Sequence, residues 1–183
     1  RDCLLSRGLG DVYKRQQYGG MSFVDFAHLN RGNIKNGILD YNRQKTGTSM
    51  RLEVLDTAEA MYKELAGERA GSSGYLFPFL SGTKNGHEEY LEYNAALSRF
   101  NRNLKTLKEV AGITSDVTSY TIRHSFAMAL KEQNVPIEMI SELLGHKSIK
   151  TTQIYLRSFS LEKMTVVNKS CFENVYNYMP KVG

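Results

Sequence analysis

The sequence is poor in cysteine and has no long apolar run. Its 183 residues include only two cysteines, Cys3 and Cys171, which form neither a disulfide framework nor a metal-ligand spacing. No apolar run approaches the roughly 20 residues that a membrane-spanning helix needs, and no internal repeat or low-complexity run is present. These absences argue against a disulfide scaffold, a membrane protein and a repeat array, and make the cytoplasm the expected location.

The sequence also lacks an acidic metal-binding cluster and a glycine-rich phosphate loop, so we expect no metal or nucleotide cofactor. Hydrophobic residues make up 41% of the chain, which is enough for one domain with its own core. The net charge is +5 and the pI is near 9.1. Such a balance permits binding to nucleic acid but does not require it.

The first sixteen residues look foreign to the rest of the chain. The run Asp11–Gln16 (DVYKRQ) reads as the translation of an adapter sequence used by library-making transposases. The residues before it have no hydrophobic periodicity and end in Gly8-Leu9-Gly10. We therefore expect residues 1–16 to be a non-native segment and residues 17–183 to form one domain.

Hydrophobic periodicity predicts a mainly α-helical domain with a small antiparallel β-sheet or hairpin. Strands are expected over Ile34–Tyr41 and Met50–Leu55, and Asn36-Gly37, a strong hairpin signal, would split the first of them. The expected helices span Gly20–Leu29, Thr57–Gly67, Tyr90–Gly112, Thr118–Asn134, Pro136–Leu144, Ser148–Arg157 and Leu161–Met179.

Three short motifs in the second half of the chain carry complementary chemistry. Arg123 lies in SYTIRHSFA (119–127), His146 ends Leu144-Gly145-His146, and Tyr155 follows that histidine by nine residues. An arginine fork can grip two phosphate oxygens, an imidazole can carry a proton, and a phenol can act as a nucleophile. Together these residues suit phosphoryl transfer through a covalent intermediate.

The order and spacing of these motifs resemble the C-terminal catalytic domain of the tyrosine recombinases, the phage integrase family. That family has His-x-x-Arg, then Leu-Gly-His, then a tyrosine nine residues later, and here Tyr120 stands in place of the first histidine. The similarity is greatest to integrases of Bacteroides-type mobile elements, where a tyrosine at this position is familiar. It covers Gly20 to about Phe172 and implies that the N-terminal DNA-binding domains of full integrases are missing.

The resemblance implies a site-specific recombinase that integrates or excises a mobile element through a 3′-phosphotyrosine intermediate. Double-stranded DNA and other protomers of the same enzyme are the implied partners. Tyr155 would be the nucleophile, Arg123 would hold the phosphate, and His146 would shift protons or hold oxygens. Lys45, in a hairpin, would protonate the leaving 5′-oxygen, and Tyr120 could donate a hydrogen bond in place of the usual histidine.

One family arginine is absent. The family helix begins Gly-x-Arg-x-x-Glu, but here the run Gly20–Asp25 has Ser22 at the arginine position, and Gly19 stands where relatives often carry another arginine. We hypothesise that Arg43 supplies the missing charge, because it lies two residues before Lys45 and shares its face on a regular strand. Ser22 itself is expected to be a hydroxyl at the start of the helix.

Outside the motifs, the helix expected over Tyr90–Gly112 carries a basic face that could contact the DNA backbone or be an ordinary solvated surface. Its members are Arg99, Arg102, Lys105 and Lys108. His124 is expected to pack or cap a helix, and His28 and His87 to lie at the surface. Two other functions stay open: a catalytically impaired DNA-binding fragment, favoured by Ser22 and Gly19, and a type IB topoisomerase-like enzyme that relaxes DNA.

Overall fold

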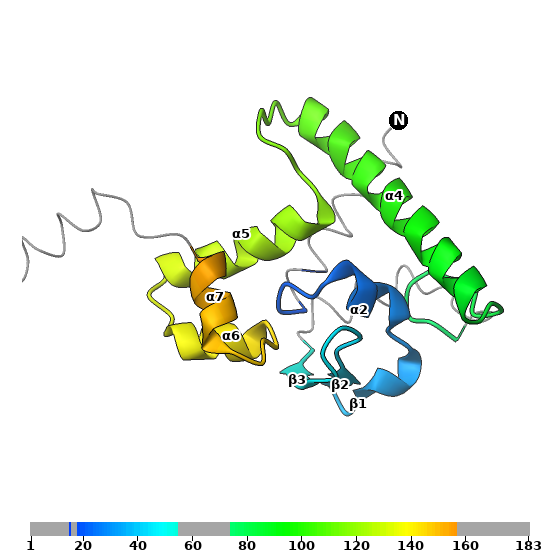
Figure 1. The fold of residues 1–183 in the computed structure, drawn as a ribbon, viewed down its shortest axis with the longest axis horizontal. Helices are drawn as coiled ribbons and strands as arrows, with labels where there is room; N and C mark the ends of the chain where they lie inside the picture. The colour runs from blue at the N-terminus through cyan, green and yellow to red at the C-terminus, as the bar shows by residue number, and fades with distance from the viewer. Residues whose placement is uncertain (1–14, 16–17, 55–73, 157–183) are drawn as a thin grey trace, which may run out of the picture.

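The computed structural model describes residues 15, 18–54 and 74–156, which form a mainly helical fold with one small sheet (Figure 1). The described elements are α2 (Phe23–His28), the 3-10 helix η1 (Arg31–Asn33), β1 (Ile34–Lys35), β2 (Ile38–Asn42), β3 (Ser49–Glu53), α4 (His87–Val110), α5 (Ser119–Glu132), α6 (Ile137–Leu143) and α7 (Ile149–Tyr155). The predicted fold class is therefore confirmed. The helices predicted over Thr57–Gly67 and Leu161–Met179 lie outside the described residues.

Helix α2 begins at Phe23 rather than at Gly20, because the residues before it are not helical. Gly20 has a positive φ of 64°, and Ser22 is extended with ψ of 152°. The Ser22 hydroxyl accepts a hydrogen bond from the Asp25 backbone N–H at 3.4 Å, which caps the helix. The prediction that Ser22 is a helix-start hydroxyl is confirmed.

The sheet is antiparallel, with strand order β1-β2-β3. Asn36 and Gly37 form the turn between β1 and β2 with φ values of 52° and 73°, so the predicted hairpin is confirmed. Leu39 and Tyr41 alternate with exposed residues and face the core from β2. Strand β2 ends at Asn42, so Arg43 and Lys45 lie in the turn that follows it.

Three buried clusters hold these elements together. The first packs α2 and the sheet with Leu76 and Phe77, and the second packs α2 against α4 and α5 around Phe23 and Phe100. The third joins α5, α6 and α7 and includes Leu144. In Figure 1, α6 and α7 lie together at one end of α5, and α2 lies with the sheet below α4. Helix α5 contacts both α4 and α6 and so connects the α6–α7 pair to α4.

Helix α4 begins three residues earlier than the predicted Tyr90. Its N-cap is Gly86, and Glu88 and Glu89 in the first turn interact favourably with the positive end of the helix dipole. The buried residues are Ala96, Phe100 and Leu104, each four residues from the next. Burial does not extend to the ends of the helix, where Leu91 and Val110 are exposed.

Helix α5 is fixed at its N-terminus by a capping box and by α4. The Thr118 hydroxyl accepts from the Thr121 N–H, and the Thr121 hydroxyl accepts from the Thr118 N–H. The Ser119 N–H also donates to Asn101 Oδ1 on α4 at 2.8 Å. These bonds determine where Arg123, in the second turn of α5, enters the core.

Two residues depart from the environments expected for them. His28 is half-buried rather than at the surface, and its Nε2 lies 3.8 Å from Glu89 Oε1. Arg15, in the segment expected to be non-native, is 1% exposed and donates to the carbonyls of Met21 at 2.7 Å and Ser119 at 2.9 Å. Arg15 thus takes part in the fold, while the non-native origin of residues 1–16 stays a prediction.

No helix in the described part of the chain is long and apolar enough to cross a membrane.

Candidate active site

The site is built around the turn that ends α6. Gly145 has a φ of 60°, its N–H donates to the Glu142 carbonyl at 2.8 Å, and the His146 N–H donates to the Ser141 carbonyl at 3.0 Å. These two bonds form the Schellman motif, which closes a helix with a left-handed residue. The turn fixes the His146 backbone and directs the carbonyls of Leu144 and Gly145 away from α6.

Arg123 reaches this turn from α5. It is 7% exposed, and its guanidinium donates to the Gly20 carbonyl at 3.0 Å and to the Leu144 carbonyl. The first acceptor precedes α2 and the second ends α6. Arg123 therefore joins three segments that are far apart in the sequence, and its charge lies in a largely dry environment where it acts more strongly than at the surface.

Arg43 reaches the same turn from the loop after β2. It is also 7% exposed, and its Nη1 donates to the Gly145 carbonyl at 2.7 Å. Its Nε lies 3.4 Å from Asp25 Oδ2 in an ion pair. Among the described residues no contact uses Arg43 Nη2. The two buried arginines thus bond to the carbonyls of consecutive residues, Leu144 and Gly145.

Asp25 anchors Arg43 and the loop that carries it. This carboxylate is 2% exposed, and one oxygen accepts from the Gln44 backbone N–H at 2.7 Å. The other oxygen accepts from the Ser22 hydroxyl at 2.5 Å and pairs with Arg43. A buried carboxylate with this many donors holds its partners in one geometry. Asp25 on α2 therefore orients Arg43, which comes from the turn between β2 and β3.

Two glycines allow the close approach of these segments. A Cβ atom at Gly145 would lie 2.5 Å from both Arg43 Cδ and Met50 Sδ, and one at Gly20 would lie 2.6 Å from the Phe126 ring. Both glycines also have positive φ, near 60°. The backbone can pass over Arg43 and Phe126 only because neither position has a side chain.

His146 is neutral at pH 7. Burial, followed by the positive charges of Arg123 and Arg43, lowers the pKa of His146 from 6.5 to about 4. Its Nδ1 forms a hydrogen bond of 2.8 Å with Thr152 Oγ1 on α7. The structure thus brings together three predicted site residues, Arg43, Arg123 and His146, at one turn.

Tyr155 is the last residue of α7. The described part of the chain includes its backbone but not the placement of its side chain. Helix α7 packs against α6, and Thr152, one turn before Tyr155, contacts His146. The backbone of Tyr155, the predicted nucleophile, therefore lies on the same helix as the threonine that contacts His146.

Two other predicted residues lie apart from this buried cluster. Lys45 is exposed in the turn after β2, whereas Arg43 in the same turn is buried, so the predicted shared strand face is wrong. Strand β2 ends before both residues, which removes the alternation on which that prediction depended. Tyr120 is 63% exposed, one turn of α5 before Arg123.

The basic face of α4 is largely solvent-exposed. Arg99, Arg102 and Lys105 are exposed, which leaves their charges accessible. Lys108 is less exposed and forms a 3.2 Å ion pair with Asp116. Lys108, one of the four residues predicted to contact the DNA backbone, therefore has an ion-pair partner within the chain that would compete with a phosphate.

Sequence reasoning missed three polar or aromatic residues that surround the cluster: Asp25, Tyr41 and Thr152. Tyr41 is 8% exposed, and burial together with the Asp25 carboxylate raises its pKa. Asp25 stands at the acidic position of the Gly-x-Arg-x-x-Glu pattern, which was a usable signal. Nothing in the local sequence distinguishes Thr152 from its neighbour Thr151.

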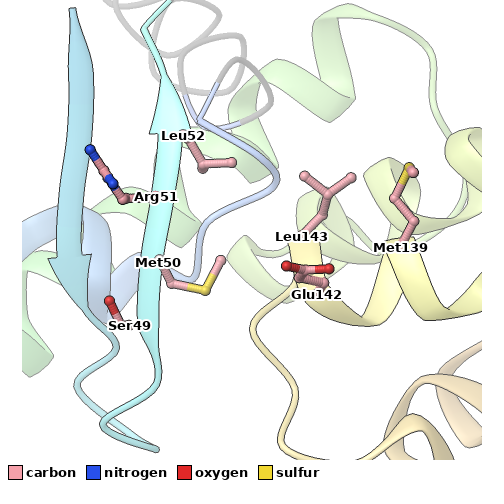
Figure 2. A pocket seen from close by; sticks show the side chains of 7 residues that line it. All are labelled: Ser49, Met50, Arg51, Leu52, Met139, Glu142 and Leu143. Carbon is pink, nitrogen blue, oxygen red and sulfur yellow. The ribbon is translucent and has the colours of Figure 1, made fainter.

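A separate groove of about 250 Å³ lies between β3 and α6. Figure 2 shows Met50 and Leu52 reaching from β3 toward Leu143 and Glu142 on α6. None of the predicted site residues lines this groove. It adjoins the site through Met50, whose sulfur packs beside Gly145, and through Glu142, whose carbonyl accepts from the Gly145 N–H.

The chain belongs to the phage integrase family, which matches residues 17–162. It is 34% identical over 120 residues to tyrosine recombinase XerC of Rickettsia prowazekii, a match that covers 56% of this chain and 39% of that protein. It is 42% identical over 69 residues to tyrosine recombinase XerD of Lacticaseibacillus casei, covering 38% of this chain and 24% of the relative. The matches thus span well under half of these relatives.

Solved structures share the fold. The crystal structure of XerA recombinase aligns with a TM-score of 0.62 at 20% identity, covering 98% of this chain and 62% of that one. The Tn1549 transposon integrase in complex with transposon right end DNA aligns with a TM-score of 0.62 at 11% identity, covering 92% and 63%. The predicted tyrosine recombinase catalytic-domain fold is therefore confirmed.

Proposed function

We propose that the chain is the catalytic part of a site-specific DNA recombinase that cuts and rejoins DNA through a 3′-phosphotyrosine intermediate. The observation that carries the proposal is the convergence of Arg43, Arg123 and His146 at the turn before α7. Two buried cations and a neutral imidazole match the developing charge of a phosphate under attack. The family match over residues 17–162 supports the same reaction class.

In the proposed first step, the Tyr155 phenol oxygen attacks the phosphorus and the bond to the 5′-oxygen breaks. The phenol proton is released, the 3′-phosphate becomes joined to Tyr155, and the 5′-oxygen leaves as a hydroxyl after protonation by Lys45. In the second step, a 5′-hydroxyl of another strand attacks the same phosphorus. The bond to Tyr155 breaks and the phenol regains a proton.

Arg123 and Arg43 are assigned to the nonbridging oxygens of this phosphate, and Arg43 replaces the arginine that Ser22 does not supply. Asp25 supports this replacement, because the acid of the α2 motif has only a neutral hydroxyl as its partner at position 22 and forms its ion pair with Arg43 at 3.4 Å. Arg43 Nη1 is already bonded to Gly145, so we assign the Nη2 group to the phosphate. Arginine suits this role because its charge is fixed and its guanidinium has five N–H donors.

The remaining assignments concern the histidine of the buried cluster and two residues outside it. His146, as a neutral imidazole, can donate to a phosphate oxygen through one nitrogen. Lys45 is exposed on a turn, as a general acid must be to meet DNA from solvent. Tyr120 donates a hydrogen bond from the first turn of α5 in place of the usual histidine.

The proposed partners are double-stranded DNA and further protomers of the same recombinase. Arg99, Arg102, Lys105 and Lys108 on α4 would contact the DNA backbone. Each site cuts one strand, so exchange between duplexes needs several protomers. We propose integration or excision of a mobile element as the biological role, membership of the Bacteroides-type integrases, and the cytoplasm as the location.

A nicked suicide duplex that contains a candidate attachment site tests the reaction. The 183-residue chain and a version carrying the N-terminal region present in longer relatives are compared for a DNA-linked protein band. We expect a band that Tyr155→Phe abolishes. A tight complex without any band would instead support the impaired DNA-binding fragment.

The topoisomerase-like alternative is tested with supercoiled plasmids. Relaxation on any plasmid, without strand exchange between two attachment sites, would favour that enzyme over a recombinase. We expect strand exchange that requires the attachment site.

A further inference from the structure

Thr152 occupies a position that packing alone does not explain. It lies on the seven-residue helix α7, its side chain is 0% exposed, and its Oγ1 is 2.8 Å from His146 Nδ1. A buried hydroxyl in a helix costs free energy unless it is hydrogen bonded. Here the bond is made to a site residue, not to the surrounding core.

The bond determines how the imidazole is presented. A neutral imidazole has one N–H and one acceptor nitrogen, and a threonine hydroxyl can serve Nδ1 as donor or as acceptor, so the bond fixes the orientation of the ring rather than its tautomer. The two nitrogens lie on different edges of the ring, so a bond through Nδ1 turns Nε2 away from α7. Arg123 and Arg43, whose charges act on His146, lie outside α7.

The same bond also positions the helix of the nucleophile. Residues three apart in a helix lie on neighbouring sides, so the backbone of Tyr155 follows Thr152 by about one turn. Helix α7 is short and is held mainly by its packing on α6 and by buried Leu156. The hydroxyl of Thr152 adds a directional bond between α7 and the turn that ends α6.

We propose that Thr152 is a positioning residue: its hydroxyl fixes the orientation of His146 and ties α7, with Tyr155, to the site. This role rests on the proposed DNA-cleaving function. Its test therefore includes a measurement on His146 that needs no DNA and no activity.

Three variants separate the hydroxyl from the packing. Thr152→Val keeps the shape and removes the hydroxyl, and Thr152→Ser keeps the hydroxyl and removes the methyl group. Thr151→Val makes the same change at the exposed neighbouring threonine. Thermal melts establish that each variant is folded before any other comparison.

The first measurement is the hydrogen bonding of the His146 ring nitrogens, read from ¹⁵N chemical shifts of the histidine-labelled chain at pH 7. The wild type, Thr152→Ser and Thr151→Val are expected to share the same Nδ1 and Nε2 shifts, and Thr152→Val to change them, because it removes the partner of Nδ1. Wild-type shifts in a folded Thr152→Val would overturn the proposal. If Thr152→Val does not fold, a folded Thr152→Ser that loses the wild-type shifts would overturn it.

The second measurement is the rate of covalent complex formation on the suicide duplex. Thr152→Val is expected to lower the rate about 10-fold or more, as expected for lost orientation, with unchanged DNA affinity. Thr152→Ser should recover most of the rate, and Thr151→Val should equal the wild type. A wild type without covalent complex would contradict the proposed function, while the ¹⁵N measurement would still decide the role of Thr152.

Discussion

The Arg43 side chain packs directly against the backbone of Gly145 and forms a hydrogen bond with it. The Arg43 Nη1 group donates to the Gly145 carbonyl at 2.7 Å, and a Cβ atom at position 145 would lie 2.5 Å from Arg43 Cδ. The middle glycine of Leu-Gly-His therefore serves two purposes. It allows the left-handed turn that ends α6, and it leaves room for a cation from the hairpin.

Gly145→Ala is expected to lower the free energy of unfolding by about 2–4 kcal/mol, from left-handed strain together with overpacking. Gly47→Ala is the matched control, because Gly47 has a φ of 65° but nothing within 4 Å of its Cβ position. Denaturant unfolding should give the control a loss of only about 1–2 kcal/mol. Equal losses in both variants would contradict the close packing at Gly145.

Arg43→Ala is expected to reduce covalent complex formation by about 100-fold or more, as for removal of a donor to a developing oxyanion. Arg51→Ala is the control, because Arg51 is an exposed arginine of the same hairpin paired with Asp40. Near-normal cleavage by Arg43→Ala would refute the replacement of the missing family arginine. Partial rescue by Ser22→Arg in the same chain would strengthen it.

Asp25→Asn is expected to weaken cleavage through Arg43 while leaving the cap of α2 largely intact. The amide keeps an oxygen for the Gln44 N–H but loses the charge that pairs with Arg43. We expect about a 10-fold lower rate of covalent complex formation. Asp25→Asn should add little to the effect of Arg43→Ala, because both changes remove the same Asp25–Arg43 ion pair. Full additivity of the two changes in a double-mutant cycle would contradict this expectation.

Acid is expected to destabilise the chain through His146. Because its pKa falls from 6.5 in the unfolded chain to about 4 in the fold, the unfolded state binds more protons between these values. Stability is therefore lost as the pH falls from about 6.5 to about 4, with no further loss from this group below that range. Urea unfolding against pH should show a shallower slope in His146→Gln, while exposed His87→Gln should keep the wild-type slope.

Charge removal on α4 is expected to weaken DNA binding most at low salt. Arg99→Ala, Arg102→Ala and Lys105→Ala should each reduce the slope of log affinity against log salt by about 1 if they contact phosphates. Lys35→Ala, an exposed lysine on β1, is the control. The measurement is DNA titration at several salt concentrations. If all four variants share the wild-type slope, this face of α4 is an ordinary solvated surface.

Local signals in the sequence predicted the helix start at Ser22, the hairpin at Asn36-Gly37 and the helix end at Gly145. Each depends on the conformational preference of one or two residues, which is a local property. The start of α4 was predicted three residues too late, because its first residues, His87 to Glu89, are polar and add nothing to the hydrophobic periodicity. Glu88 and Glu89 are in the first helical turn, where acidic side chains are favourable.

The site could be predicted only in part. Arg123 and His146 were selected from motif spacing and Arg43 from its position two residues before Lys45, and the structure brings the three together. The link from Asp25 to Arg43 and the link from Thr152 to His146 depend on how distant or neighbouring segments fold back on one another, and residue identity does not encode these links. The shared face of Arg43 and Lys45 failed because it assumed a strand that ends at Asn42.

Arg123 and Arg43 are anchored on the carbonyls of two consecutive residues, Leu144 and Gly145. This arrangement affects which residues are retained when a copy of the gene decays. A copy that has lost Tyr155 still needs acceptors for these buried cations, and removing either cation leaves a carbonyl without its donor or the Asp25 charge without its ion-pair partner. Selection for a foldable product alone would then preserve both arginines. Their presence in a gene therefore reports an intact fold, and under the proposed function Tyr155 is the better marker of a chain that can cleave DNA.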